Sequence, residues 1–225
     1  MIKLEKVCKK YGNQKVLDDV SFQVAQGEFV SIVGHSGAGK STLVNLIFGM
    51  KKIDSGNIYV NDIHINSLTP AEIQMFRRNI GMIFQDFKLL EKNTVFENIA
   101  FALEVCGYSE KEINSRVKDV LKVVGLEEKR NHFPSQLSGG EAQRCAIARA
   151  LIHAPNILIA DEPTGNLDPE NAKSLADLLL KINKSGTTII LSTHNENIVN
   201  FLMKRVIKIK NGKIESDKKN SGYGK

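Results

Sequence analysis

The sequence predicts an α/β fold with a mostly parallel sheet, an N-terminal antiparallel β layer and an inserted α-helical lobe. Apolar runs rich in β-branched residues recur along the chain with helical patterns between several of them, which is typical of parallel strands covered by helices. Before the first run, apolar and polar residues alternate more loosely, as they do in antiparallel strands at a sheet edge. The stretch from about 90 to 135 holds no strand candidate, which indicates the helical lobe.

The expected strands can be placed in order along the chain. Two antiparallel strands are expected in IKLEKVCKKYG and KVLDDVSFQVAQG, on either side of a glycine-containing turn. The parallel strands are expected in EFVSIVG at 28–34, NIGMIF at 79–84, NILIAD at 156–161 and TTIILSTH at 187–194.

Helix starts are marked by capping residues. The dipeptides at 69–70 and 168–169 each place a capping threonine or aspartate before a proline, which predicts the first turn of a helix. Ser109 and Glu112 have the spacing of a capping box, and the apolar residues after them recur at helical spacing. These apolar residues are Ile113, Val117, Val120, Leu121 and Val124.

A chain of 225 residues with 42% hydrophobic residues suits a single domain. Its core is expected at about 1–87 and 155–215, with the helical lobe at about 88–154. From position 204 onward, eight basic residues minus two acids account for the net charge of +6, and 216–225 is expected to be a basic flexible tail. Such a tail can attract anionic lipid, but no aromatic interleaving or recognition helix accompanies it, so no nucleic acid is expected.

Composition also indicates a cellular compartment. No stretch approaches the roughly 18 to 20 uninterrupted apolar residues of a membrane span, and the first residues lack the apolar core of a signal peptide. Cys8, Cys106 and Cys145 form no CxxC pair and are expected to be reduced thiols, mostly in the core. The protein is therefore expected to stay in the cytosol.

A phosphate-binding loop is predicted between the strand FVSIV and the helical pattern STLVNLIFG. GHSGAGKS fits G-x-x-x-x-G-K-[ST] in the strand-to-helix context that the motif requires. Its glycines let backbone N–H groups surround a phosphate, Lys40 can reach the terminal phosphates, and the Ser41 hydroxyl can ligate Mg²⁺. The nucleotide-binding candidates are Gly34, His35, Ser36, Gly37, Ala38, Gly39, Lys40, Ser41 and Thr42.

Polar residues end three other strands. Asp161 and Glu162 follow NILIA, and two adjacent carboxylates are costly there unless a cation or a proton-transfer task occupies them. In a phosphoryl-transfer site, the first would hold Mg²⁺ and the second would polarise an attacking water. His194 and Gln85 also lie at strand ends, where parallel strands deliver residues to a ligand.

A second glycine-containing sequence, LSGGEAQR at 137–144, also has the features of a phosphate loop at the start of a helix. The ordered set GHSGAGKST, Gln85, LSGGE, ILIADEP, NLD and STH resembles the nucleotide-binding subunit of ATP-binding cassette (ABC) proteins over essentially the whole chain. The resemblance implies a P-loop NTPase fold with a RecA-like core, and an ATPase whose cofactors are ATP and Mg²⁺.

The resemblance also implies an arrangement of two subunits. In this family, a homodimer forms head to tail in the ATP-bound state, and the LSGGE segment of one subunit closes over the ATP on the P-loop of the other. One chain would then carry two phosphate-binding surfaces because each ATP contacts two chains. The residues implied for the second surface are Ser138, Gly139, Gly140 and Glu141.

Further roles follow from the resemblance residue by residue. Tyr11 would stack on the adenine, and Val16 would also contact the nucleotide. Glu162 would be the general base and His194 would contact the γ-phosphate. Gln85 is implied as a catalytic residue, as a metal ligand with Ser41 and Asp161, and as a link to a partner. The segment NLD at 166–168 would communicate between the two sites.

A narrower resemblance concerns the stretch FQDFKLLEKNTVFENIAFALEVCG at 84–107. It is most similar to the family members of bacterial cell division, which work with an integral membrane partner at the cytoplasmic face of the plasma membrane and regulate peptidoglycan hydrolases. An apolar coupling surface around Phe87, Leu89, Leu90 and Val95 would receive a cytoplasmic helix of that partner. The alternatives are a lipoprotein-release or macrolide-export ATPase, and a nucleotide-gated scaffold whose hydrolysis is incidental.

Overall fold

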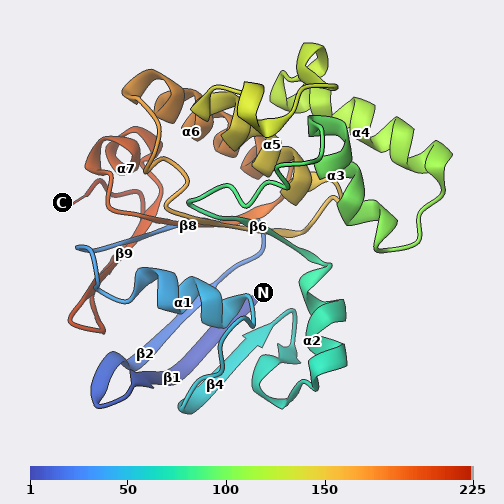
Figure 1. The fold of residues 1–225 in the computed structure, drawn as a ribbon. Coiled ribbons are helices and arrows are strands. Elements are labelled where there is room, and N and C mark those ends of the chain that lie inside the picture. The colour runs from blue at the N-terminus through green and yellow to red at the C-terminus, as the bar shows by residue number, and fades with distance from the viewer. Residues whose placement is uncertain (224–225) are drawn as a thin grey trace.

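The computed structural model describes residues 1–223 and contains two sheets flanked by helices (Figure 1). One sheet has four antiparallel strands in the order β2-β1-β4-β5, and the other has six strands in the order β10-β9-β3-β8-β7-β6. All strands of the larger sheet are parallel except β10, which pairs antiparallel with β9. The bounds are β1 Ile2–Tyr11, β2 Gln14–Val24, β3 Phe29–Val33, β4 Ser55–Val60, β5 Ile63–His64, β6 Ile80–Ile83, β7 Ile157–Asp161, β8 Thr188–Thr193, β9 Arg205–Lys210 and β10 Lys213–Lys218. The predicted fold class is confirmed.

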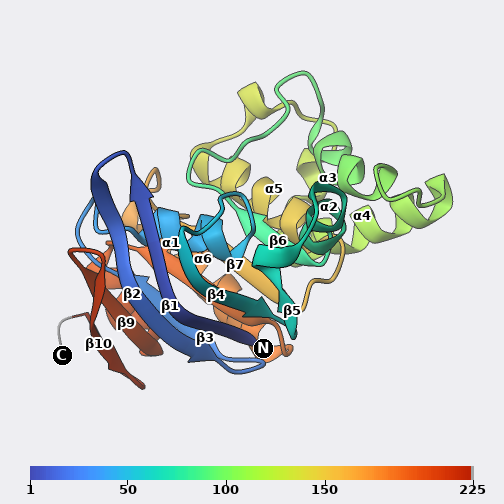
Figure 2. The same cartoon turned by 90° about the horizontal axis from the view of Figure 1, so that it is seen from below.

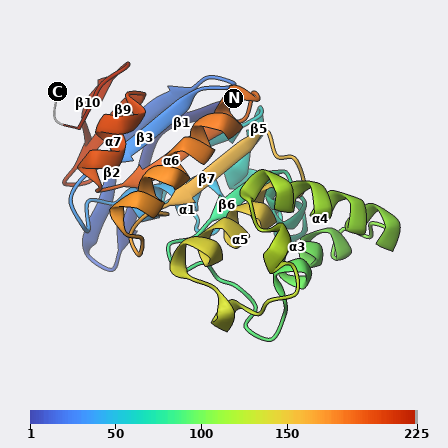
Figure 3. The same ribbon diagram turned by 90° about the horizontal axis from the view of Figure 1, so that it is seen from above.

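The larger sheet lies between two layers of other elements (Figures 1 and 2). A hydrophobic core fills the space on each of its faces. Helix α1 (Lys40–Ile47) and the antiparallel sheet cover one face, and α5 (Gly139–Leu151), α6 (Pro169–Lys184) and the helical lobe cover the other. On β7, Ile159 packs into the first core and Leu158 into the second, as expected for strand alternation. Figure 3 shows from above the helices that cover this second face, among them α5 and α6.

The helical lobe begins its helices with side-chain caps. Helices α3 (Val95–Glu104), α4 (Glu110–Val124) and α5 each start with a complete capping box, and α4 has the one predicted at Ser109 and Glu112. The predicted caps Thr69 and Asp168 begin α2 (Pro70–Arg77) and α6, and Asn195 caps α7 (Glu196–Leu202). The short 3₁₀ helices are η1 Ile65–Ser67, η2 Glu127–Lys129 and η3 Pro134–Gln136.

The chain between β6 and α3 is held to the helices by two side chains. Arg149 of α5 donates hydrogen bonds to the carbonyls of Lys88 at 2.6 Å and Phe87 at 2.7 Å, both of which have left-handed backbones. The fully buried Asn98 of α3 accepts a hydrogen bond from the Leu90 N–H at 2.7 Å and donates back to the Leu90 carbonyl at 3.0 Å. These contacts give an irregular segment a defined position between the core and the helical lobe.

The end of the chain differs from the prediction of a flexible tail over 216–225. Strand β10 continues to Lys218 and pairs with β9. The Arg205 guanidinium forms ion pairs with the carboxylates of Glu28, at 2.9 Å, and Asp217, at 2.7 Å. A charge that the sequence places in a basic segment therefore has acidic partners in the fold. Tyr223 packs against a small apolar cluster of β3, α7 and β9. Residues 224–225 of the expected tail lie outside the described residues.

Two other expectations can be compared with the structure. Within residues 1–223, none of the helices has the length and apolar character of a membrane span. The three cysteines are free thiols, but only Cys145 is buried, while Cys8 and Cys106 are half-buried. The expectation that most of them belong to the core was therefore wrong.

Gly81 tests how closely α5 packs on the larger sheet. A Cβ at Gly81 would lie 2.6 Å from the Ala150 carbonyl oxygen and 2.8 Å from Leu158 Cδ1. We expect Gly81→Ala to lower the free energy of unfolding by about 1–3 kcal/mol, because the helix must move away from the strand. Urea unfolding of the nucleotide-free protein measures this loss. Gly139→Ala is the control, since the nearest atom to its Cβ would be the Asn166 carbonyl oxygen at 3.7 Å; equal losses in both variants would contradict the packing argument.

Candidate active site

The predicted phosphate loop joins β3 to α1 and leaves the start of that helix without a side-chain cap. The N-cap is Gly39 with φ of 105°, and the first turn contains no acidic residue. Each of the helices α2 to α7 has a side chain that caps it. A Cβ at Gly39 would lie 2.9 Å from the Val16 carbonyl oxygen, and one at Gly34 would lie 2.4 Å from that of Ile209. The uncapped N–H groups at the start of α1 can donate to a phosphate. The tight packing around Gly34 and Gly39 leaves no room for side chains, so the loop backbone itself can lie against that phosphate.

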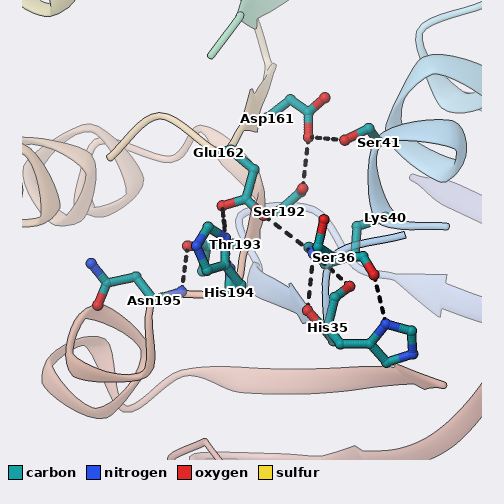
Figure 4. Close-up of polar contacts among 11 residues, drawn as sticks. His35, Ser36, Lys40, Ser41, Asp161, Glu162, Ser192, Thr193, His194 and Asn195 are labelled. Atoms are coloured by element: carbon teal, nitrogen blue, oxygen red, sulfur yellow. Dashed lines mark hydrogen bonds and ion pairs between the residues drawn. The ribbon is translucent and has the colours of Figure 1, made fainter. Parts of the chain in front are cut away.

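Lys40 lies inside this loop with its ammonium group fully surrounded (Figure 4). Its Nζ donates to the Gly34 carbonyl at 2.9 Å and the His35 carbonyl at 3.2 Å, and lies 3.2 Å from Glu162 Oε1. An ammonium group has three N–H donors, so these three acceptors match its capacity. The side chains of Lys40 and Glu162 are only 5% and 8% exposed, which makes this a buried ion pair.

Asp161 ends β7 and faces the start of α1 (Figure 4). Its Oδ1 accepts hydrogen bonds from Ser41 Oγ at 3.0 Å and from Ser192 Oγ at 2.7 Å. Burial raises the pKa of the Asp161 carboxyl, and the two hydroxyls act in the opposite direction. A carboxylate beside a hydroxyl is the hard oxygen donor set that Mg²⁺ prefers, so Ser41 and Asp161 fit this ion.

Glu162 lies next along the chain, with a backbone conformation unusual for its type. Its φ is 48°, in the left-handed region, which costs a residue with a Cβ roughly 1–2 kcal/mol. The Glu162 N–H donates to the Ser192 carbonyl at 2.9 Å. Its Oε2 accepts from the His194 N–H at 3.2 Å and lies 2.9 Å from His194 Nδ1. A strained but well-held backbone thus directs this carboxylate toward both Lys40 and His194.

Gln85 follows β6 and contacts a different segment. Its carbonyl accepts a hydrogen bond from Asn166 Nδ2 at 3.3 Å, and its amide Nε2 would be 3.4 Å from a Cβ at Gly165. Among the described residues, no hydrogen bond or ion pair joins Gln85 to Ser41 or Asp161. Its assignment as a metal ligand and catalytic residue stays a prediction.

The β1–β2 hairpin carries two further residues expected to contact the nucleotide, Tyr11 at the adenine and Val16. Val16 lies against the phosphate loop at Gly39, as the close approach of its carbonyl shows. Tyr11 is 44% exposed, and its ring centroid lies 5.5 Å from the Lys9 ammonium. The hairpin therefore offers an accessible aromatic ring, which is what a stacked base requires.

The LSGGE segment lies apart from the site of its own chain. Ser138 caps α5: its Oγ accepts from the Glu141 N–H at 3.3 Å, while Glu141 Oε2 accepts from the Ser138 N–H at 2.8 Å. Ser138 and Gly139 are exposed, and Gly140 is buried against Asn171. In the described part of the chain, no hydrogen bond or ion pair connects 138–141 with the phosphate loop.

The structure thus brings together Lys40, Ser41, Asp161, Glu162 and His194 from three different elements. The sequence reasoning missed Ser192, which contacts both carboxylate residues. The available signal was a serine and a threonine directly after the three apolar residues IIL in the run TTIILSTH. Polar residues that interrupt a buried strand need hydrogen-bond partners, so they point to a nearby polar site.

Comparisons with known proteins identify the family of this site. Residues 17–165 match the family described as ABC transporter. The chain belongs to this family. The ABC cassette structure titled "Dimeric Structure of MJ0796, a Bacterial ABC Transporter Cassette" is similar with a TM-score of 0.90 and 40% identity, covering 99% of this chain and 100% of that one. A second MJ0796 structure, described as a post-hydrolysis state bound to ADP and Pi, has a TM-score of 0.89, 39% identity and the same coverage.

Individual relatives within the ABC family include proteins named for cell division and for methionine import. The cell division ATP-binding protein FtsE of Streptococcus pneumoniae D39 is 48% identical over 225 residues, which is 100% of this chain and 98% of that protein. FtsE of Bacillus subtilis 168 is also 48% identical, over 100% of this chain and 99% of that protein. The methionine import protein MetN of Clostridioides difficile 630 is 46% identical over 95% of this chain but 67% of its own length. This ABC cassette is an enzyme that hydrolyses ATP.

Substitution of Glu162 by glutamine tests its predicted role in hydrolysis separately from nucleotide binding. Glu162→Gln removes the carboxylate that we predict to accept a proton from water, but leaves Lys40 and the phosphate loop in place. We expect turnover to fall by about 10²–10⁴-fold, the usual contribution of general base catalysis, with ATP affinity nearly unchanged. Phosphate release and equilibrium ATP binding measure the two quantities. Turnover within threefold of the wild type would remove Glu162 from the role of base.

Asp161→Asn tests the cost of the buried carboxylate. Burial raises the pKa of Asp161 in the folded protein. Ionisation of its carboxyl, as the pH rises through this raised pKa, therefore lowers the free energy of unfolding. We expect Asp161→Asn to raise the melting temperature of the nucleotide-free protein at pH 7, and this gain to shrink as the pH falls. The exposed Asp177→Asn is the control. A melting temperature that is lower than wild type at pH 7 would contradict this account.

Proposed function

We propose that the chain is the ATP-hydrolysing subunit of a membrane complex in bacterial cell division, with the integral membrane protein FtsX as its partner. The observation that carries this proposal is the 48% identity to FtsE along essentially the whole length of both proteins. The stretch 84–107 supports it, because it leaves β6, contains Gln85 and continues into α3, so it joins the sheet to the helical lobe. The complex would sit at the cytoplasmic face of the plasma membrane and regulate peptidoglycan hydrolases.

We further propose that two copies pair head to tail around two ATP molecules. The dimeric MJ0796 cassettes support this arrangement. So does the position of Ser138 and Gly139, which are exposed and, within the described residues, form no hydrogen bond or ion pair with the phosphate loop of their own chain. The N-terminal N–H groups of α5 would then bind the γ-phosphate held by the other subunit.

Within each site, the proposed roles follow from the contacts. The phosphate loop and Lys40 bind the phosphates, while Tyr11 stacks on the adenine and Val16 contacts the nucleotide. Mg²⁺, held by Ser41, Asp161 and Gln85, would supply positive charge to the terminal phosphates. Glu162 accepts a proton from the attacking water at Oε1 or Oε2, and His194 holds the Glu162 carboxylate from the other side.

The coupling surface for FtsX needs a correction. Val95 is fully buried and belongs to the core, because it starts α3 and its side chain faces the lobe interior. Phe87 and Leu89 are half-buried and Leu90 is 38% exposed, so the surface consists of these three residues. Arg149 and Asn98 hold their backbones, which presents the surface in one conformation.

The first test is ATPase activity with and without FtsX in lipid, with Glu162→Gln as the blank. We expect FtsX to raise turnover of the wild type and to leave the variant inactive, because the partner acts through the same catalytic residue. Activity that is indifferent to FtsX would remove this partner and favour a lipoprotein-release or macrolide-export complex. Full division function with Glu162→Gln would favour a nucleotide-gated scaffold.

Leu90→Asp tests the coupling surface. A charge at this exposed apolar position places a desolvation cost in the interface, so we expect FtsX co-purification to fall at least tenfold, equivalent to about 1.4 kcal/mol. ATPase activity without FtsX should stay near that of the wild type. Val123→Asp is the matched control, because Val123 is 58% exposed on another part of the helical lobe. Equal losses of FtsX in both variants would contradict a local surface.

A further inference from the structure

Ser192 is a buried polar residue near the carboxyl end of β8. It lies in β8 with 0% exposure, directly after the buried residues Ile189, Ile190 and Leu191. A buried hydroxyl is unfavourable unless it finds a hydrogen-bond partner. Here the partner belongs to the active site.

The register of the parallel strands places Ser192 opposite Asp161. The Ser192 Oγ donates to Asp161 Oδ1 at 2.7 Å, and the Ser192 carbonyl accepts from the Glu162 N–H at 2.9 Å (Figure 4). One residue therefore contacts the side chain of the first acid and the backbone of the second. The left-handed backbone of Glu162 has its N–H satisfied by this contact.

The hydrogen bonds of Asp161 are unevenly distributed between its two oxygens. Oδ1 accepts from both Ser192 and Ser41. Among residues 1–223, no donor contacts Oδ2. With Oδ1 held on two sides, rotation of the carboxylate is restricted and Oδ2 is left free for a cation or its water.

We propose that Ser192 is a positioning residue for the Mg²⁺ site of this ATPase. Its hydroxyl holds the Asp161 carboxylate in the orientation that leaves Oδ2 available, and its carbonyl holds the Glu162 backbone. This inference rests on ATP hydrolysis by the cassette and does not depend on cell division or FtsX.

Ser31 provides a matched control on the neighbouring strand. It lies in β3, is 1% exposed, and its Oγ has no hydrogen-bond partner. Ser31→Ala removes the same hydroxyl from the same sheet without touching either carboxylate. Any effect common to Ser31→Ala and Ser192→Ala is therefore an effect on the core.

The experiment measures Mg²⁺ dependence of ATP binding in the Glu162→Gln background, where turnover is blocked. We expect Ser192→Ala to raise the Mg²⁺ concentration for half-maximal enhancement of ATP binding by roughly tenfold, in the range seen when groups that orient metal ligands are removed. ATP affinity in EDTA should stay within twofold, because the phosphate loop and hairpin are intact. Ser192→Thr should restore the Mg²⁺ dependence, and Ser31→Ala should match the parent.

Each contrary result would overturn the proposal. A Mg²⁺ dependence that is unchanged in Ser192→Ala, or shifted equally in Ser31→Ala, assigns Ser192 to packing. If Ser192→Ala weakens ATP binding in EDTA as much as it does with Mg²⁺, the effect belongs to the phosphate loop and not to the Mg²⁺ site. If Ser192→Ala fails to fold, Ser192→Thr and Ser192→Val have similar volumes and differ by the hydroxyl; equal Mg²⁺ dependence in that pair would also overturn the proposal.

Discussion

The buried ammonium group of Lys40 is the constraint on which the active site depends. A lysine taken out of water is costly unless its three N–H groups have acceptors, and here two carbonyls of the phosphate loop and one carboxylate supply them. This requirement wraps the loop around the lysine and draws Glu162 toward it. A nucleotide that binds in the loop brings negative charge to the same group, so phosphate and Glu162 compete for Lys40.

The larger sheet makes that arrangement possible. Parallel strands deliver their carboxyl ends to one edge, so Val33, Asp161 and Thr193 end three neighbouring strands next to each other. Residues distant in sequence therefore become neighbours at this edge. The cost of two adjacent acids is offset by hydroxyl and N–H donors from β8 and the residue that follows it, and by hydroxyl and ammonium donors from α1.

Much of this could be predicted from the sequence because it is local. Alternation and β-branched runs indicated the strands, Ser109 and Glu112 marked a helix start, and the phosphate loop followed from its glycine spacing. What could not be predicted depends on partners distant in sequence. Arg205 contacts Asp217 and Glu28 only because β9 lies between β10 and β3, so the prediction of a flexible tail from residue 216 began inside a strand. The burial of Val95 depends on the packing of the whole helical lobe.

The contact of Arg149 with the Phe87 and Lys88 carbonyls has a mechanical consequence. Helix α5 has 13 residues and is about 20 Å long, with Gly139 at one end and Arg149 near the other. A rod of this length tilts as a unit. In the dimer that we propose, displacement of the chain after Gln85 would therefore move the opposite end of α5, where Ser138 and Gly139 would face the other subunit.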